Sequence, residues 1–417
     1  MNSKERIQET LDTFNSIGER PEGMQRLAYT MEERQVHDMF AELCAKAGMQ
    51  VRVDEVGNVI ARKEGRIKEA SPVAIGSHLD TVYTGGKYDG TGGVVVGLEV
   101  VRRLNEKQVM TDHPIELIAF VAEESSRFGM STIGSKAMAG LLSEDSTEKA
   151  KDKEGISLKQ AMERAGFPGA DIAEAKREEG AMQAFLELHI EQGQELERTG
   201  KKVAIATGVA APTRLEVIVQ GRSAHSGTTS MDIRKDALSA ASRLVLKIEE
   251  AAKQESSHKT VATVGVLDVS SGAMNVVPGE VAFKVDIRGL DIASKQRVIA
   301  AIESESSVLE SEKGMTISME VLSDEEPILL DSEIQEVLKG ACASVDIDPL
   351  YIPSGAGHDA MNMAKICPTG LLFVPSRNGI SHNPEEFTPI EDFVTGADVL
   401  EQAVMKLAVT KEVKVSK

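Results

Sequence analysis

Apolar runs that end in polar or ionisable residues recur along the first half of the chain. Residues 73–75 have the character of the end of a buried strand, and residues 92–98 that of the start of a buried helix. The scheme returns at 113–125, where "HPIELIAFVAEES" ends in two glutamates, and at 182–198, where "MQAFLELHIEQGQELER" places a histidine at its strand end. Strands and helices that alternate in this way predict an α/β fold with a mostly parallel sheet covered on both faces.

The pattern of hydrophobic and polar positions changes after residue 213. It predicts a strand, a long amphipathic helix, two strands, a second helix and a last strand, at 214–221, 234–253, 260–269, 279–289, 294–311 and 315–322. That βαββαβ order is typical of a ferredoxin-like unit. Turn-rich segments flank it, and the earlier apolar pattern resumes at 369–376. We therefore predict a domain at 212–327 inserted into a larger one formed by 1–211 and 328–417.

The composition is that of a globular chain with an acidic balance. Of 417 residues, 41% are hydrophobic and 27% are charged, and the formal net charge is -19. No basic stripe could neutralise phosphates, which argues against nucleic-acid binding. The chain has no run of 18 apolar residues that would span a membrane, and its charged start has no apolar signal core. Cys44, Cys342 and Cys367 lie far apart, which favours a reducing, cytoplasmic setting without disulfides.

Ionisable side chains gather at the predicted strand ends and in a glycine-rich loop within residues 74–93. The set comprises His78, Asp80, Asp89, Glu123, Glu124, His189 and His382. Imidazoles and carboxylates together suit a divalent ion such as zinc, manganese or cobalt. The set is too large for one ion but suits two ions that share an aspartate. A phosphate cradle at "GTGGVVVG" is a weaker alternative, since that segment matches neither the P-loop nor the GxGxxG pattern.

Seven separated blocks between residues 76 and 387 carry a resemblance to a known family. They are "GSHLDTVYTGGKYDG", "AEESSRFGMSTIGSKAMAG", "LELHIEQG", "GRSAHSGTTSMDIRKDA", "NVVPGEVAFKVDIRG", "SGAGHDA" and "NGISHNPEEF". With these blocks in this order, the chain resembles the M20 metallopeptidase-like amidohydrolases, and within them the hydantoinase/carbamoylase group. That group includes N-carbamoyl-L-amino acid hydrolases, β-ureidopropionases and allantoate amidohydrolases.

The resemblance implies a site for two divalent metal ions in each subunit. One ion would be held by His78, Asp89 and His189, and the other by Asp89, Glu124 and His382. Asp80 would orient His78 through the second nitrogen of its ring. Glu123 would be the general base, which takes a proton from water and passes it to the leaving nitrogen.

The resemblance also makes the inserted domain a lid and a homodimer contact. The substrate would be held by Gln192, His225, Asn275, Arg288 and Gly357, some of them supplied across the dimer interface. Arg288 suits bidentate pairing with an α-carboxylate. His225 and Asn275 suit donation to an oxyanion, so His225 joins Glu123 and Asp80 as a catalytic candidate.

The remaining histidines receive no such role. His358 lies in the "SGAGHDA" block and its role stays open. His37, His113 and His258 fall in polar or helix-end contexts, and we expect them to be solvated.

We expect a hydrolase that cleaves the carbamoyl C–N bond of N-carbamoyl-L-amino acids and releases the L-amino acid, carbon dioxide and ammonia. An allantoate amidohydrolase is the near alternative, because "SGAGHDA" and "NGISHNP" occur in both groups. An aminopeptidase or dipeptidase is a wider alternative, which His189 and Arg288 weigh against. A non-catalytic binding module is opposed by the presence of Glu123 together with every implied metal ligand.

Overall fold

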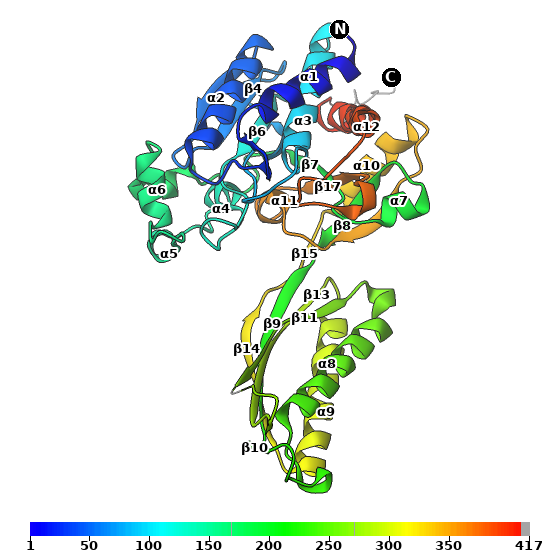
Figure 1. Cartoon of the computed structure of the whole chain (residues 1–417). Helices are drawn as coiled ribbons and strands as arrows, with labels where there is room; N and C mark the ends of the chain where they lie inside the picture. The colour runs from blue at the N-terminus through cyan, green and yellow to red at the C-terminus, as the bar shows by residue number, and fades with distance from the viewer. Residues whose placement is uncertain (168, 271, 410–417) are drawn as a thin grey trace. The chain divides into compact units, whose positions relative to one another are not determined.

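The computed structural model describes residues 1–167, 169–270 and 272–409, and its contacts divide the chain into two compact units (Figure 1). The first unit consists of Met1–Thr207 with Leu330–Lys417, and the second of Gly208–Leu329. Each unit has an apolar core of its own. The predicted insert at 212–327 lies inside the second unit.

The first unit is built on a nine-stranded sheet, of which β15 and the last two residues of β8 fall within the residue range of the second unit. Its central strands run parallel in the order β17, β7, β5, β6, and antiparallel strands flank them on both sides. The strands are β3 (Gln50–Val53), β4 (Val59–Lys63), β5 (Val73–His78), β6 (Ile115–Phe120), β7 (Ala184–Ile190), β8 (Ala204–Val209), β15 (Ile328–Leu329), β16 (Leu350–Ser354) and β17 (Thr369–Val374). The predicted α/β fold around a mostly parallel sheet is confirmed, with its antiparallel strands toward the edges.

The central strands are apolar because both of their faces are covered. Every residue of β5, β6, β7 and β17 is buried. Along β7, Leu186 and Leu188 pack into one core, whereas Phe185 packs into the core on the opposite face. Each large apolar side chain buried in this way contributes roughly 1.5–3 kcal/mol to stability. Continuous apolar runs therefore mark these strands in the sequence.

Helices cover both faces of the sheet. The larger core takes residues from α1 (Ser3–Asn15), α2 (Met31–Lys46), α3 (Thr91–Glu106), α10 (Ser332–Ala343) and α12 (Ile390–Ala408). The other core takes residues from α4 (Ile133–Met138), α7 (Glu195–Thr199) and α11 (Asp359–Met363). The shorter elements of this unit are β1 (Glu19–Arg20), β2 (Gly23–Met24), α5 (Glu144–Lys149), α6 (Leu158–Arg164), η1 (Gly169–Ala175) and η4 (Arg377–Gly379).

The second unit is a four-stranded antiparallel sheet with two long helices on one face (Figure 1). Its main elements are β9 (Ala211–Gln220), α8 (Ala237–Gln254), β11 (Val261–Ser270), β13 (Glu280–Gly289), α9 (Ile292–Lys313) and β14 (Thr316–Asp324). Short elements are β10 (Ala224–His225), η2 (Met231–Ile233), η3 (Ser256–His258) and β12 (Val276–Val277). The strand order β11, β13, β9, β14 and the chain order βαββαβ confirm the predicted ferredoxin-like pattern.

The histidines that we expected to be solvated fall into three different environments. His258 is exposed and His113 is half-buried, but His37 is only 3% exposed, so the expectation for His37 is wrong. His37 lies in α2 beside Val36 and one turn before Phe40, and that face of the helix packs into the core. Within the described residues no helix is long and apolar enough to cross a membrane.

Candidate metal centre

The ends of the parallel strands position the predicted ionisable residues. His78 is the last residue of β5, and His189 is the penultimate residue of β7. Glu123 and Glu124 follow the end of β6, and His382 lies in the segment that follows β17. Because carboxyl ends of parallel strands meet at one edge of a sheet, these segments converge there.

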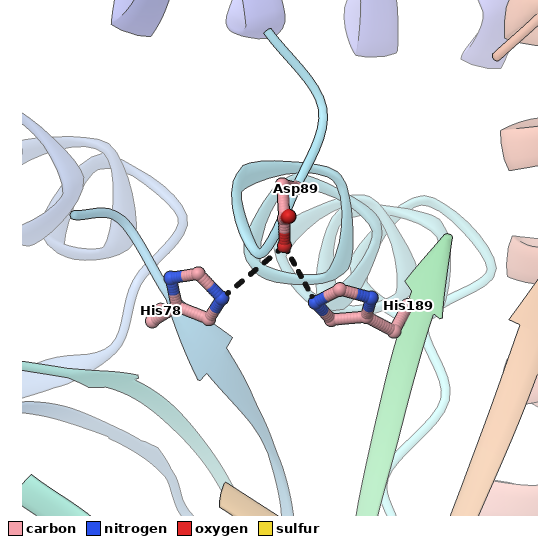
Figure 2. Close-up of side chains that lie close together, drawn as sticks. All are labelled: His78, Asp89 and His189. Atoms are coloured by element: carbon pink, nitrogen blue, oxygen red, sulfur yellow. Dashed lines mark ion pairs between the residues drawn. The ribbon is translucent and has the colours of Figure 1, made fainter. Parts of the chain in front are cut away.

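Asp89 lies in the loop between β5 and α3, and its Oδ1 atom faces two imidazoles. Oδ1 is 3.0 Å from His189 Nε2 and 3.6 Å from His78 Nε2 (Figure 2). The next residue, Gly90, has φ +62°, and a Cβ atom there would lie 2.4 Å from the His78 ring. Gly90 therefore provides both the backbone conformation and the space that this approach requires.

The second oxygen of Asp89 faces a different group of ligand atoms. His382 Nε2 lies 3.3 Å from Asp89 Oδ2 and 3.2 Å from Glu124 Oε1. Two compact donor sets thus share one carboxylate: His78, Asp89 and His189 form one, and Asp89, Glu124 and His382 form the other. The structure brings together the five residues that the resemblance implies as ligands.

The hydrogen bonds of two imidazoles fix the direction of their lone pairs. His78 Nδ1 is 3.1 Å from the carbonyl oxygen of Asp80, and His189 Nδ1 is 2.8 Å from that of Ile190. A carbonyl oxygen only accepts, so each Nδ1 carries the hydrogen and each neutral ring keeps its lone pair on Nε2. The His78 lone pair faces Asp89, another acceptor, and His189 Nε2 faces both Asp89 and the Gly90 N–H, which donates to it at 3.3 Å. Acceptors that face one another require a proton or a cation between them, and imidazole with carboxylate is a donor set that divalent transition metals take.

The charges of the cluster act in the same direction. Burial alone would raise the pKa of Asp89, but His189, His382 and His78 hold that pKa well below its usual range. Hydrogen bonds to Asp89 and Glu124 raise the pKa of His382 to about 11. Burial raises the pKa of Glu123 well above its usual range, against the attraction of His78. The site therefore stabilises positive charge among its carboxylates, as a cation site does.

Asp80 does more than the orienting role that the resemblance implies. Its carbonyl oxygen, rather than its side chain, is the nearer partner of His78 Nδ1, since Asp80 Oδ1 lies 3.4 Å away. Its carboxylate accepts the backbone N–H groups of Glu123 at 3.0 Å and Glu124 at 2.9 Å. One buried side chain thus links the His78 strand end to both glutamates.

Sequence reasoning missed Glu33, which continues this pattern of hydrogen bonds. Glu33 lies in α2, is 2% exposed, and accepts the N–H of Ala122 at 2.7 Å. Ala122 has φ +53°, a left-handed conformation that costs free energy in a residue with a side chain. The strained turn directly before Glu123 is therefore held by carboxylates on three successive N–H groups. No local sequence motif marks Glu33, because its partner is backbone.

Glu187 was also missed, although the sequence contains a signal for it. It interrupts the apolar run of β7 and is 1% exposed. Its carboxylate accepts the Ser77 hydroxyl at 2.9 Å and the Ala360 N–H at 2.8 Å. With His189 and His358 it forms a third donor set. An acid inside a continuous apolar strand was the available clue.

Two predicted substrate contacts lie in the first unit. Gln192, with φ +56°, donates its Nε2–H to Asp89 Oδ2 at 2.9 Å, so it contacts a predicted ligand. Gly357 precedes His358, which is buried with its ring centroid 4.5 Å from that of His189. The Nε2 atom of His358 lies 2.9 Å from Ser354 Oγ. His358 thus packs behind a predicted ligand.

Residues 74–406 match the peptidase family M20/M25/M40. The chain belongs to this family. M20-family proteins generally bind divalent metals, and the donor sets described above suit such ions.

Comparisons with individual proteins show which members of the family the chain is similar to. The chain is 40% identical over 405 residues to an N-carbamoyl-L-amino acid amidohydrolase of Geobacillus stearothermophilus, covering 97% of this chain and 98% of that protein. It is 34% identical over 406 residues to the allantoate amidohydrolase of Escherichia coli K12, with the same coverage. A crystal structure of a hydantoinase/carbamoylase family amidase from Burkholderia multivorans matches with a TM-score of 0.90 and 34% identity, covering 98% of each chain. This M20-family chain is thus an amidohydrolase, a hydrolase that acts on amides.

The other predicted substrate contacts lie in the second unit of this M20-family chain. His225 and Asn275 are exposed, and the N–H that follows His225, that of Ser226, donates to the Asn275 carbonyl at 3.0 Å. Pairing of β10 with β12 therefore brings His225 and Asn275 together. Arg288 lies on β13, and its Nε atom donates to Asp286 Oδ1 at 2.8 Å.

Proposed function

We propose that this amidohydrolase hydrolyses N-carbamoyl-L-amino acids to the L-amino acid, carbon dioxide and ammonia. The observation that supports this most directly is the position of Asp89 in two donor sets at once, with Glu123 beside them. Divalent ions, for which we propose zinc, manganese or cobalt, suit both sets. When bound, two such ions lower the pKa of water and polarise the carbonyl group that is attacked.

The proposed base is Glu123. Its Oε2 atom lies 3.8 Å from His78 Nε2, and its side chain is buried at the strand ends. Burial raises its pKa, which makes its carboxylate a better proton acceptor near neutral pH. Glu123 would take one proton from the attacking water and deliver it to the amino nitrogen as the carbamoyl C–N bond breaks. Carbamic acid leaves and separates into carbon dioxide and ammonia, which balances the reaction.

The ligands are proposed as the two donor sets describe them: His78 and His189 on one ion, Glu124 and His382 on the other, and Asp89 on both. Asp80 would hold His78 and the glutamate turn in register through the contacts given above. Mutation of a residue that hydrogen-bonds a metal ligand typically lowers metal affinity by about 10–100-fold.

The second unit would supply three of the five proposed substrate contacts. Arg288 would bind the α-carboxylate, and Asp286 holds its guanidinium in place. His225 and Asn275 would donate to the oxyanion, while Gln192 and the Gly357 N–H would contact the substrate from the first unit. We also propose a homodimer, because β11 and β14 are sheet edges and Val261 on β11 is 57% exposed. The cytoplasmic location stays a prediction.

An allantoate amidohydrolase is the second candidate, favoured by the relative from Escherichia coli. Allantoate likewise offers a ureido group and a carboxylate, so the same residues would serve.

An ammonia-release assay on the metal-loaded enzyme separates the candidates. We expect the highest kcat/KM with an N-carbamoyl-L-amino acid and a lower one with its D-isomer, whose side chain points the other way when the carboxylate and the ureido group are both held. A higher kcat/KM for allantoate would replace the first candidate by the second. Cleavage of dipeptides without ammonia release from either ureido substrate would contradict both.

A further inference from the structure

Glu386 lies between β17 and α12 in a position that neither the predicted chemistry nor the donor sets use. Its side chain is 4% exposed. One oxygen, Oε1, accepts two successive backbone N–H groups, that of Tyr88 at 2.8 Å and that of Asp89 at 3.1 Å. Glu386 therefore binds the backbone of the residue that both donor sets share.

The other oxygen of Glu386 reaches the side chain of Asp89 through Ser381. The Ser381 hydroxyl lies 3.0 Å from Glu386 Oε2 and 2.7 Å from Asp89 Oδ2. Glu386 thus holds Asp89 directly at its N–H, and the single Ser381 hydroxyl hydrogen lies within reach of both carboxylates and donates to one of them at a time. Ser381 directly precedes His382, a proposed ligand in the same donor set as Asp89.

Gly86 provides the space that this arrangement needs. A Cβ atom at position 86 would lie 2.3 Å from the carboxyl carbon and from Oε1 of Glu386. Such a contact is far shorter than van der Waals separation, so any larger residue would displace Glu386. Glu386 can therefore be buried at this position only because residue 86 has no side chain.

We infer that Glu386 is a positioning residue that fixes Asp89 between the two proposed metal positions. This inference rests on the proposed function, because the role of Asp89 as a shared ligand is itself proposed. Glu386 connects the loop at 86–89 with the loop at 381–386, and each loop carries a ligand of the same donor set. It acts through hydrogen bonds: Oε1 accepts the N–H groups of Tyr88 and Asp89, and Oε2 lies within hydrogen-bond distance of the Ser381 hydroxyl.

This role predicts a difference between two substitutions. In Glu386→Gln, the amide oxygen can still accept both N–H groups, and the amide nitrogen can donate to Ser381 Oγ. We expect its metal affinity and kcat/KM to stay within about threefold of wild type. In Glu386→Ala both contacts are lost, and we expect affinity for one ion to fall by about 10–100-fold.

The experiment measures manganese and zinc binding to the metal-free full-length enzyme by chelator competition, together with ammonia release and the urea midpoint of the metal-free protein. Glu385→Ala is the matched control, since Glu385 is the exposed neighbour and should bind metal as wild type does. If Glu386→Ala does not fold, Gly86→Ala replaces it, because the added methyl group should displace Glu386 and weaken the same ion.

The outcomes are distinct. Wild-type affinity in Glu386→Ala, or in Gly86→Ala where that variant is used, overturns the inference. A Glu386→Gln variant as impaired as Glu386→Ala also overturns it, because charge rather than hydrogen bonding would then be required. If wild type itself binds fewer than two ions, the proposed function fails, and the inference falls with it.

Discussion

The two units of this chain bury very different groups. In the first unit, carboxylates and imidazoles lie at the ends of buried strands, and Asp80 and His189 are at most 1% exposed. In the second unit the main core is apolar, and the buried Lys295 donates to two backbone carbonyl oxygens. The residues predicted to act there, such as His225 and Asn275, are exposed. Burying an ionised group is costly unless hydrogen bonds or opposite charge compensate. The first unit is therefore built around its chemistry, whereas the second carries its proposed chemistry on the surface of an ordinary core.

In the first unit the cost of burying the acids is offset by one repeated kind of hydrogen bond. Buried acids accept backbone N–H groups of the segments that carry the proposed ligands: Glu33 binds Ala122, Asp80 binds Glu123 and Glu124, and Glu386 binds Tyr88 and Asp89. Each such bond holds a loop in place beside the site. Ordered positions for the proposed ligands result from these contacts.

The largest expected effect comes from separating the two regions. Val209 pairs with Ile328, so the connections to the second unit are neighbours and residues 211–326 can be replaced by a short turn. The remaining protein should keep wild-type metal stoichiometry, because the five proposed ligands lie in the first unit. Turnover should be abolished, since Arg288, His225 and Asn275 are removed. Elemental analysis and ammonia release measure the two properties, and near-wild-type turnover would contradict the assignment of substrate contacts to the second unit.

Within the first unit, the neighbouring glutamates should differ. Glu123→Gln should retain both ions and lose about 10²–10⁴-fold in kcat, since it removes a general base. Glu124→Gln should lose one ion, because Glu124 lies 3.2 Å from His382 in the second donor set. Metal stoichiometry and kcat of the two purified variants separate the roles. Loss of an ion in Glu123→Gln with full occupancy in Glu124→Gln would reverse the assignment.

The site residues that could be predicted from the sequence are those at the end of an apolar run that marks a buried strand. Apolar runs at β5 and β7 end in His78 and His189, so strand ends and candidate ligands are read from the same segments. The positions of Glu33 and Glu386 could not be read in this way. Their partners are backbone N–H groups of residues far away in the chain. Nearly every residue has a backbone N–H, so the identity of the partner residue gives no sign of the contact.

His37 shows a second limit, which concerns burial. Polar residues such as Gln35 and Asp38 lie near it along the chain, and this led to the wrong expectation that it is solvated. Burial in a helix depends on the face, and Glu33, His37 and Ala41 are spaced one turn apart beside the apolar stripe of Val36 and Phe40. In α2 the polar residues Glu33 and His37 beside the apolar stripe are buried as well, and only the tertiary structure shows this.

A smaller effect is expected from an experiment that tests whether His225 of the second unit acts on the site of its own subunit or of the partner. If His225 acts on the partner's site, subunits with Glu123→Gln and subunits with His225→Ala should complement one another. A mixed dimer would have one site with both defects and one with neither, so an equal mixture should regain about a quarter of wild-type activity. Subunit exchange verified by native mass spectrometry, followed by ammonia release, provides the measurement. Mixed dimers as inactive as both parents would place His225 in its own subunit's site or outside the chemistry.

The smallest expected effect concerns stability in the first unit, where His37 is buried and its Nε2 atom has no hydrogen-bond partner among the described residues. Burial lowers the pKa of His37 to about 4, below its value of about 6.5 in the unfolded chain. Above pH 6.5 both states leave this ring neutral, so it contributes no pH dependence. As the pH falls from 6.5 toward 4, the unfolded state binds a proton that the folded state does not, and stability is lost by about 1.4 kcal/mol per pH unit. Urea unfolding of metal-free His37→Gln should therefore show a shallower loss of stability than wild type between pH 6.5 and 4, and the same slope between pH 7 and 8. Equal slopes in the acidic range would show that His37 is protonated in the folded protein.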